Sequence, residues 1–177
     1  MLVSIIAALA DDRIIGSEGG GIPWELPRDR DYFRSYTRGK WMLLGRRTYE
    51  EMRGWFTTQK PIVVTTRAAY RPFSSSHPVA NSIPEAIDIA RGEKAAELVI
   101  GGGGVLYATA MPFADKLVLT RLEADFPVEK PIRFPEFEDS GVWEMRRREF
   151  WPPDKANVFP AAVEIWNKRL PTPKAAD

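Results

Sequence analysis

The chain lacks cysteine and has a single histidine, His77, among its 177 residues. Without thiols it cannot form disulfides, use a thiolate nucleophile or build a thiolate metal site, and one imidazole cannot make a metal cluster. We therefore expect no metal. An excess of charge of one sign is also absent, because 25 Lys and Arg are interspersed with 24 Asp and Glu. This balance gives no electrostatic reason to expect nucleic acid or an acidic membrane as a partner.

Long hydrophobic runs are absent as well. Residues 2–10 are apolar, but no Lys or Arg precedes them and the charged residues 11–13 end the run, so we expect neither a signal peptide nor a membrane span. With 44% hydrophobic and 28% charged residues, the chain is expected to form one domain over residues 1–170. Residues 171–177 are expected to be a disordered tail. We expect a monomer in the cytoplasm.

Apolar strands alternate with helical segments along most of the chain. We expect strands at 2–9, 41–45, 61–67, 79–80, 97–100 and 117–121, and helices from about Pro27 and Tyr49 and over 82–90 and 105–110. The near-continuous apolar run at 2–9 is typical of a central strand that is covered on both faces. Residues 143–146 and 163–166 instead alternate apolar and polar, as antiparallel strands with one wet face do. The pattern predicts an α/β domain with a central, mostly parallel sheet flanked by helices, and a C-terminal antiparallel hairpin.

The segment from Gly16 to Phe33 reads GSEGGGIPWELPRDRDYF and concentrates the unusual residues of the chain. Pro27 suits a first helical turn, and Asp29 and Phe33 then fall four residues apart on one helix face. A separate basic stripe is formed by Arg30, Arg34 and Arg38. An acid at position 29 is either a surface acid that complements the helix dipole or an acid held in an apolar cleft to handle a proton. Helix statistics alone favour the first interpretation.

Three strand ends carry residues that suit phosphate. The strand 41–45 ends in Gly45 and is followed by RRT at 46–48, and the strand 97–100 runs into four glycines. Backbone N–H groups at such turns, with arginines beside them, can bind an anion. The strand 61–67 ends in Thr65, Thr66 and Arg67, which fit a 2′-phosphate. The simpler alternatives are a solvated basic turn, a flexible glycine segment and a polar strand end.

Residues 22–29, IPWELPRD, resemble the P-W-x-L-P-x-D signature of dihydrofolate reductases. Further motifs of this family follow in the family's order: SIIAA at 4–8, DRIIG at 12–16, GRRTYE at 45–50, VIGGG at 99–103, LVLT at 117–120 and FP at 134–135. Ordered motifs over roughly residues 2–166 are much more specific than any one of them. The chain is identified as a member of this family.

The resemblance implies NADPH-dependent reduction of a 7,8-dihydropterin, most directly 7,8-dihydrofolate to tetrahydrofolate. Hydride is transferred to C6 and a proton reaches N5 through water. The catalytic residues that it implies are Asp29, Trp24, Ile22 and Thr120. The substrate-binding residues are Ile6, Ala8, Arg30, Phe33, Arg34, Met52, Phe56, Gln59 and Ile100. The NADPH-binding residues are Ala8, Ile15, Gly16, Gly45, Arg46, Arg47, Thr48, Thr65, Thr66, Arg67, Gly102, Gly103, Gly104, Val105 and Tyr107.

Some positions depart from the family's pattern. Counting from Gly45 places Gln59 where the family has an arginine that binds the α-carboxylate of the substrate's glutamate, and glutamine cannot form that charged pair. Either Lys60 or Arg34 takes over the carboxylate, or the natural substrate lacks it, as dihydromethanopterin does. The interval from the strand 97–100 to Tyr107 also looks one residue longer than in relatives.

A hypothesis from another class is a catalytically silent protein that binds NADPH or a pterin. It predicts the loss of catalytic positions before cofactor positions. The implied catalytic residues Trp24, Asp29 and Thr120 are all present, although a threonine in a strand is otherwise only a strand former. The sequence therefore favours the reductase.

Overall fold

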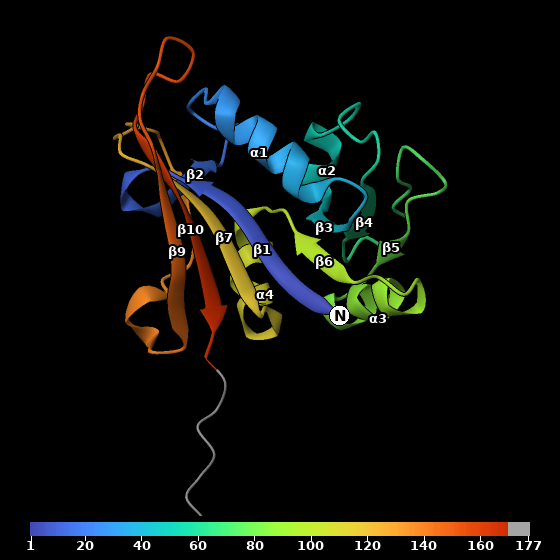
Figure 1. Cartoon of the computed structure of the whole chain (residues 1–177). Helices are drawn as coiled ribbons and strands as arrows, with labels where there is room; N and C mark the ends of the chain where they lie inside the picture. Colours follow the sequence, from blue (N-terminus) through green and yellow to red (C-terminus); the bar gives the residue numbers. More distant parts are fainter. Residues whose placement is uncertain (170–177) are drawn as a thin grey trace, which may run out of the picture.

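The computed structural model describes residues 1–169, so the predicted tail at 171–177 lies outside the described residues. One eight-stranded sheet runs through the molecule in the order β5-β4-β3-β6-β1-β7-β10-β9 (Figure 1). Its strands are β1 (Leu2–Leu9), β3 (Trp41–Gly45), β4 (Lys60–Val64), β5 (Val79–Ala80), β6 (Glu97–Ile100), β7 (Lys116–Leu122), β9 (Trp143–Trp151) and β10 (Ala161–Lys168). The strands from β5 to β7 in this order are parallel, and β10 is antiparallel to both β7 and β9. The predicted α/β sheet, its central first strand and its C-terminal hairpin are confirmed.

Four α-helices cover the two faces of the sheet. They are α1 (Pro27–Thr37), α2 (Arg46–Glu51), α3 (Ile83–Gly92) and α4 (Gly104–Ala110). Figure 1 shows α1 and α2 on one side of the sheet and α3 and α4 on the other. Helix α2 begins three residues before the predicted start at Tyr49, because the chain turns into the helix directly after the extended Gly45.

A small second sheet joins β2 (Ile14–Ser17) to β8 (Pro131–Arg133). Three short 3-10 helices complete the described elements: η1 (Asp11–Arg13), η2 (Met111–Phe113) and η3 (Glu138–Ser140). The sequence did not predict the β2–β8 pair, because β8 is only three residues long and its partner lies more than a hundred residues away. This pair fixes the start of the glycine loop that follows Ser17.

Alternate residues of the central strands face two different hydrophobic layers, as the pleat of a strand requires. On β6, Ile100 belongs to the larger cluster, which includes residues of α3 and α4. Its neighbour Val99 belongs to a smaller cluster on the other face, which includes Tyr49 of α2 and against which Phe33 of α1 packs. The face of the sheet that α1 covers can therefore be assigned residue by residue.

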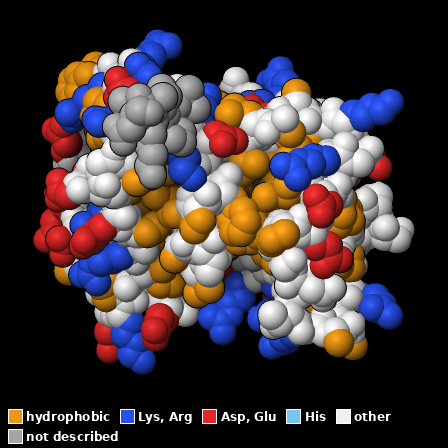
Figure 2. All heavy atoms as spheres, turned by 90° about the horizontal axis from the view of Figure 1, so that it is seen from below, with side chains coloured by type: hydrophobic (Ala, Val, Ile, Leu, Met, Phe, Trp, Pro, Cys, Tyr) orange, Lys and Arg blue, Asp and Glu red, His pale blue; other side chains and the backbone are white. Residues whose placement is uncertain are grey.

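The surface of the α3 and α4 side is mixed in character. Figure 2 shows apolar side chains gathered near the middle of this face, with both positive and negative side chains mainly toward its rim. Within residues 1–169, no helix is both long and apolar enough to cross a membrane. Because β1, β3, β4, β6 and β7 are parallel, their carboxyl ends meet at one edge of the sheet. In open α/β sheets this is the edge at which ligands bind.

Candidate active site

Asp29 lies in the first turn of α1, close to the carboxyl end of β7. Burial raises the pKa of Asp29 above its ordinary value, and a hydrogen bond with the side chain of Thr120 partly offsets this rise. Thr120 is itself buried in β7. A carboxyl in such surroundings takes up a proton more readily than a solvated one, which favours the interpretation as a proton-handling acid over that as a surface acid.

The charge on Asp29 affects the pKa of two tyrosines, Tyr107 and Tyr32. Tyr107 of α4 donates from its hydroxyl to the Ile6 carbonyl at 2.8 Å. Burial and, after it, the Asp29 charge raise the pKa of Tyr107. The pKa of Tyr32 is raised by burial, with Glu149 and Asp29 adding to the rise. Elements α1, β1, β7 and α4 thus converge on the carboxyl.

The predicted apolar walls lie on the α1 face of the sheet. Phe33, Met52 and Phe56 are partly buried against the smaller hydrophobic cluster. The ring of Phe33 meets Trp55 edge-on at 5.3 Å between centroids, and Phe56 stacks on Tyr49 at 5.7 Å. The predicted residue Ile6 also faces this cluster. Trp55, which the sequence did not single out, therefore belongs with Phe33.

The structure does not place Ile100 on the α1 side of the sheet, where its predicted substrate contact would lie. Ile100 is fully buried in the larger cluster, on the sheet face away from Phe33. The residue that faces Phe33 is Gly101, where an added Cβ would lie 2.9 Å from Leu44 Cδ2 and 3.7 Å from Phe33 Cζ. Counting back from Tyr107, rather than forward from the strand, would have found this shift.

Gln59 does not extend toward a ligand, which corrects its predicted role in substrate binding. Its Oε1 accepts hydrogen bonds from the backbone N–H groups of Thr57 at 3.1 Å and Thr58 at 3.2 Å. Its Nε2 donates to the Thr37 hydroxyl at 3.3 Å. Gln59 is buried, so its amide ties the loop before β4 to the end of α1.

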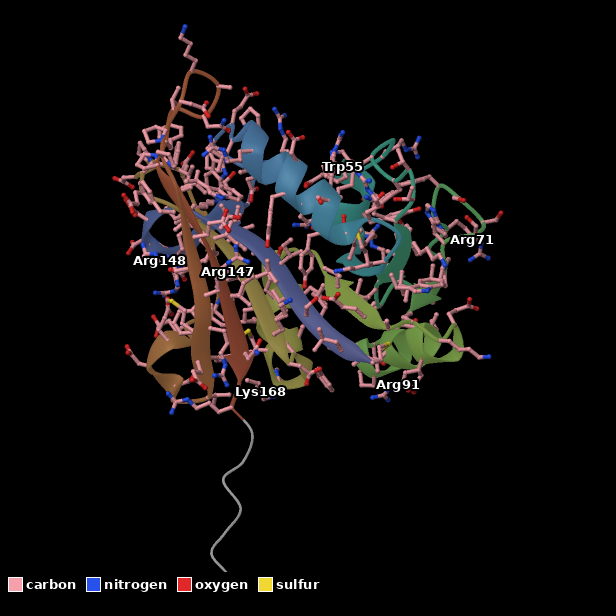
Figure 3. The ribbon with its side chains drawn as sticks, viewed as in Figure 1. Trp55, Arg71, Arg91, Arg147, Arg148 and Lys168 are labelled. Carbon is pink, nitrogen blue, oxygen red and sulfur yellow. The ribbon has the colours of Figure 1, made fainter. Side chains whose placement is uncertain are left out.

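The predicted basic stripe of α1 lies on its solvent side. Arg30 and Arg34 are both exposed, and the guanidinium of Arg34 lies over the Trp55 ring, 4.5 Å from its centroid. Figure 3 shows Trp55 beside α1 and α2, at the opposite end of the molecule from Arg91. Arg34 is therefore a charged group beside the predicted aromatic wall, whereas the expected role of Arg30 stays a prediction.

The glycine loop lies between β2 and α1. Gly20 and Gly21 have φ angles of 93° and 80°, in the region that favours glycine. After them, Ile22 is 60% exposed, whereas Trp24 is buried with its ring centroid 5.3 Å from that of Phe126. The tryptophan anchors the end of the loop and leaves Ile22 at the surface.

The glycines of two neighbouring strand ends meet in the predicted cofactor region. The Gly45 N–H donates to the Gly102 carbonyl at 2.8 Å. A Cβ added at Gly45 would lie 3.5 Å from the Gly102 carbonyl oxygen. A Cβ added at Gly103 would lie 3.1 Å from Thr48 Oγ1. Side chains at these glycines would crowd the backbone that a pyrophosphate has to approach, so the residues fit the predicted cofactor.

The remaining predicted cofactor residues surround these glycines in sequence and structure. Arg46 pairs with Glu50 of its own helix at 2.7 Å, whereas Arg47 is exposed. Beyond β4, the Thr65 hydroxyl accepts from the N–H of the exposed Arg67 at 3.2 Å. Two of the other predicted residues, Thr66 and Val105, are exposed. Gly16 is buried, and Ala8, Ile15 and Gly104 are partly buried. An added Cβ at Gly104 would lie 2.4 Å from Ile132 of β8, which brings the small sheet to this region.

A carboxyl with a raised pKa, at the edge of a parallel sheet where glycine turns and arginines gather, is typical of a nucleotide-dependent α/β enzyme. Comparison with known proteins makes the class specific. The model of the family described as Dihydrofolate reductase matches residues 2–168. The chain belongs to the dihydrofolate reductase family.

Individual relatives agree with this assignment. Dihydrofolate reductase of Bacillus subtilis (strain 168) is 31% identical over 168 residues, with 95% of each chain covered. Dihydrofolate reductase type 3 of Salmonella typhimurium is 35% identical over 159 residues, which cover 90% of this chain and 93% of the relative.

A solved structure is similar over nearly its whole length. Dihydrofolate reductase from Enterococcus faecalis, complexed with NADP(H) and RAB-propyl, has a TM-score of 0.82 and 30% identity. The match covers 94% of this chain and 96% of that one. The predictions of the family, of an NADPH-dependent oxidoreductase of this type and of NADPH as its cofactor are confirmed at the level of the family.

Proposed function

We propose that this protein reduces 7,8-dihydrofolate to tetrahydrofolate with NADPH. The observation that carries the proposal is the carboxyl of Asp29, partly buried beside Thr120 and with a raised pKa, in a chain that belongs to the dihydrofolate reductase family. A raised pKa is the property that general acid–base assistance near neutral pH requires.

NADPH supplies the hydride, which goes to C6 of the dihydropterin. Asp29 binds the amino group and the adjacent ring nitrogen of the pterin and raises the basicity of N5. The proton for N5 comes from water, because a carboxylate fixed at the other edge of the ring does not reach N5. The exposed Ile22 and the anchored Trp24 lie at the end of the glycine loop, where such water would enter.

The cofactor is held by the glycine turns and by the polar strand ends. Gly45, Gly102 and Gly103 allow the backbone to approach the pyrophosphate, with Thr48 beside them. Arg47 and Arg67 are exposed cations that suit the phosphates, and Thr65 orders the backbone of Arg67. Planar arginine beside hydroxyls favours a 2′-phosphate and hence NADPH over NADH.

The substrate's aryl ring packs on Phe33, Met52 and Phe56, and its glutamate is bound at the Trp55 end. Gln59 already uses its amide within the protein, so it adds no charge there. Arg34, held over the Trp55 ring, supplies the cation for the carboxylate. This assignment replaces the family's arginine with one from α1.

Comparing NADPH consumption with dihydrofolate and with dihydromethanopterin tests the proposal. We expect dihydrofolate to give the higher kcat/KM, and the Asp29→Asn variant to lose that activity. A preference for dihydromethanopterin would overturn the choice of substrate and leave the reductase in place. NADPH binding without turnover of either pterin would instead support the silent binding protein.

A further inference from the structure

The catalytic helix begins without a capping side chain of its own. Its N-cap residue is Leu26, which has no polar side-chain atom, although the first N–H groups of a helix need partners. The side chain of Asn157 provides one, because its Oδ1 accepts from the backbone N–H of Arg28 at 2.8 Å. Asn157 is buried and lies in the loop between β9 and β10, 129 residues further along the chain. A distant loop therefore caps the turn that carries Asp29.

The loop that presents Asn157 is itself well ordered by hydrogen bonds. Oδ1 of Asp154 accepts from the backbone N–H of Ala156 and of Asn157, both at 2.8 Å, and from Asn157 Nδ2 at 2.9 Å. The Asp154 N–H donates in turn to the Asn157 carbonyl at 2.8 Å. The amide of Asn157 is thus oriented before it meets α1.

The side chain of Arg28 makes a second connection between the helix and the hairpin. Its guanidinium forms an ion pair with Asp154 and donates to the Pro152 carbonyl at 3.0 Å. It also lies 5.9 Å from the Trp151 ring, which meets Tyr32 of α1 edge-on at 5.5 Å. Figure 1 shows the hairpin loop beside the start of α1.

We propose that Asn157 is a positioning residue for Asp29: by capping the first turn of α1 from the hairpin loop, it holds the carboxyl against Thr120. The proposal rests on the proposed function, in which Asp29 binds the pterin. Asp29 is the second residue after Pro27, so fraying of an uncapped first turn would move the carboxyl and admit water to it.

The pKa of Asp29 reports this position directly. The groups that face Asp29 are Thr120 on β7, Tyr107 on α4 and Tyr32 on its own helix. An Asn157→Ala variant leaves all three in place and removes the cap, together with the hydrogen bond from Asn157 Nδ2 to Asp154. Because burial is the main cause of the raised pKa, fraying should lower it toward its ordinary value.

The experiment compares Asn157→Ala with Ser82→Ala. Ser82 caps α3, accepting from the Glu85 N–H at 3.3 Å, so it is a matched cap on a helix that does not carry Asp29. Loss of either cap should lower the melting temperature by about 2–6 °C. Only Asn157→Ala should lower the pKa of Asp29, measured by carbon-13 NMR of the carboxyl, and increase amide exchange at Arg28 at least about fivefold. It should also reduce kcat with dihydrofolate about three- to tenfold, with the KM for NADPH unchanged.

An unchanged Asp29 pKa in Asn157→Ala, with the same loss of melting temperature as in Ser82→Ala, would overturn the proposal. If Asn157→Ala does not fold, Asn157→Ser is measured with the same two outcomes. The NMR titration needs no substrate, so failure of the wild-type protein to reduce dihydrofolate would reject the proposed function and leave the positioning role to be decided by the pKa.

Discussion

Gln59 and Thr37 are joined by a hydrogen bond between buried side chains, with the amide nitrogen donating to the hydroxyl at 3.3 Å. The Thr37 hydroxyl donates in turn to the Phe33 carbonyl at 2.8 Å. The last turn of α1 is thereby connected to the loop before β4. Gln59 thus uses its amide to fix the loop beside the aromatic wall.

The carboxyl of Asp29 should be needed for turnover. We expect Asp29→Asn to reduce kcat/KM for dihydrofolate at least about 100-fold at neutral pH, which is within the usual range for acid–base assistance. The loss should shrink at low pH, where the substrate is already protonated. Steady-state rates from acid to neutral pH test this. Near-normal activity at neutral pH would move the assignment to another acid, with Asp31 the next candidate.

The same substitution should stabilise the folded protein at neutral pH. Burial raises the folded-state pKa of Asp29, so the folded state binds this proton more tightly than the unfolded chain does. The resulting stabilisation is fully present below the unfolded pKa and is lost as pH rises through the folded one. The melting temperature of Asp29→Asn should therefore exceed that of the wild type near pH 7, and the difference should vanish below about pH 4. If Asp29→Asn instead melts at a lower temperature than the wild type at pH 7, burial does not destabilise the charged form of Asp29.

Arg67 should select NADPH over NADH. Removing a planar cation from a phosphate site costs a charged hydrogen bond, worth roughly 1.5–3 kcal/mol. We expect Arg67→Ala to raise the KM for NADPH by about tenfold or more and to change that for NADH little. Arg91→Ala is the matched control, because Arg91 is an exposed arginine in the last turn of α3 and was not predicted to bind the cofactor. Equal effects of Arg67→Ala on both cofactors would contradict a 2′-phosphate contact.

The sequence predicted the elements that local pattern determines. The apolar run of β1, the Pro27 start of α1 and the capped start of α3 at Ser82 each depend on residues within a few positions. The contact between Asn157 and Arg28 could not be predicted in this way, because it joins residues 129 apart and Asn157 belongs to no recognisable motif.

The prediction for Ile100 depended on counting along the chain. Ile100 and Gly101 are adjacent, but successive residues along an extended chain point to opposite faces of the sheet. A shift of one residue therefore separates Ile100, in the larger hydrophobic cluster, from Gly101, beside Phe33. The role predicted for Gln59 differs from its contacts in the structure for another reason. Its internal hydrogen bonds depend on the fold of the loop, which composition does not reveal.

Gly101 should not tolerate a side chain. An added Cβ would lie 2.9 Å from Leu44 Cδ2 and 3.1 Å from Met42 Cε, so the smaller cluster would have to shift. Overpacking of this kind costs typically about 1–3 kcal/mol. We expect Gly101→Ala to lower the unfolding free energy by that amount and to raise the KM for dihydrofolate through Phe33. Gly92→Ala is the control, since an added Cβ there meets nothing within 4 Å, and denaturant unfolding of both variants decides the matter.

The last prediction concerns the cation for the substrate's carboxylate. Arg34 lies over the Trp55 ring, whereas Arg38, one turn further along the stripe, is the C-cap of α1. If Arg34 binds the glutamate, Arg34→Ala should raise the KM for dihydrofolate about tenfold, equivalent to roughly 1.4 kcal/mol, and Arg38→Ala should change it little.

Gln59→Arg completes this test. With Arg34 in place the carboxylate already has a partner, so the new arginine should change the KM for dihydrofolate by less than about threefold. It should lower stability, because it breaks the hydrogen bonds to Thr57, Thr58 and Thr37 around a buried side chain. A pterin without glutamate serves as the control, since neither Arg34→Ala nor Gln59→Arg should alter its KM. If Gln59→Arg instead lowers the KM for dihydrofolate tenfold and Arg34→Ala has no effect, the carboxylate has no cation in the natural protein, and a substrate without that carboxylate becomes the better choice.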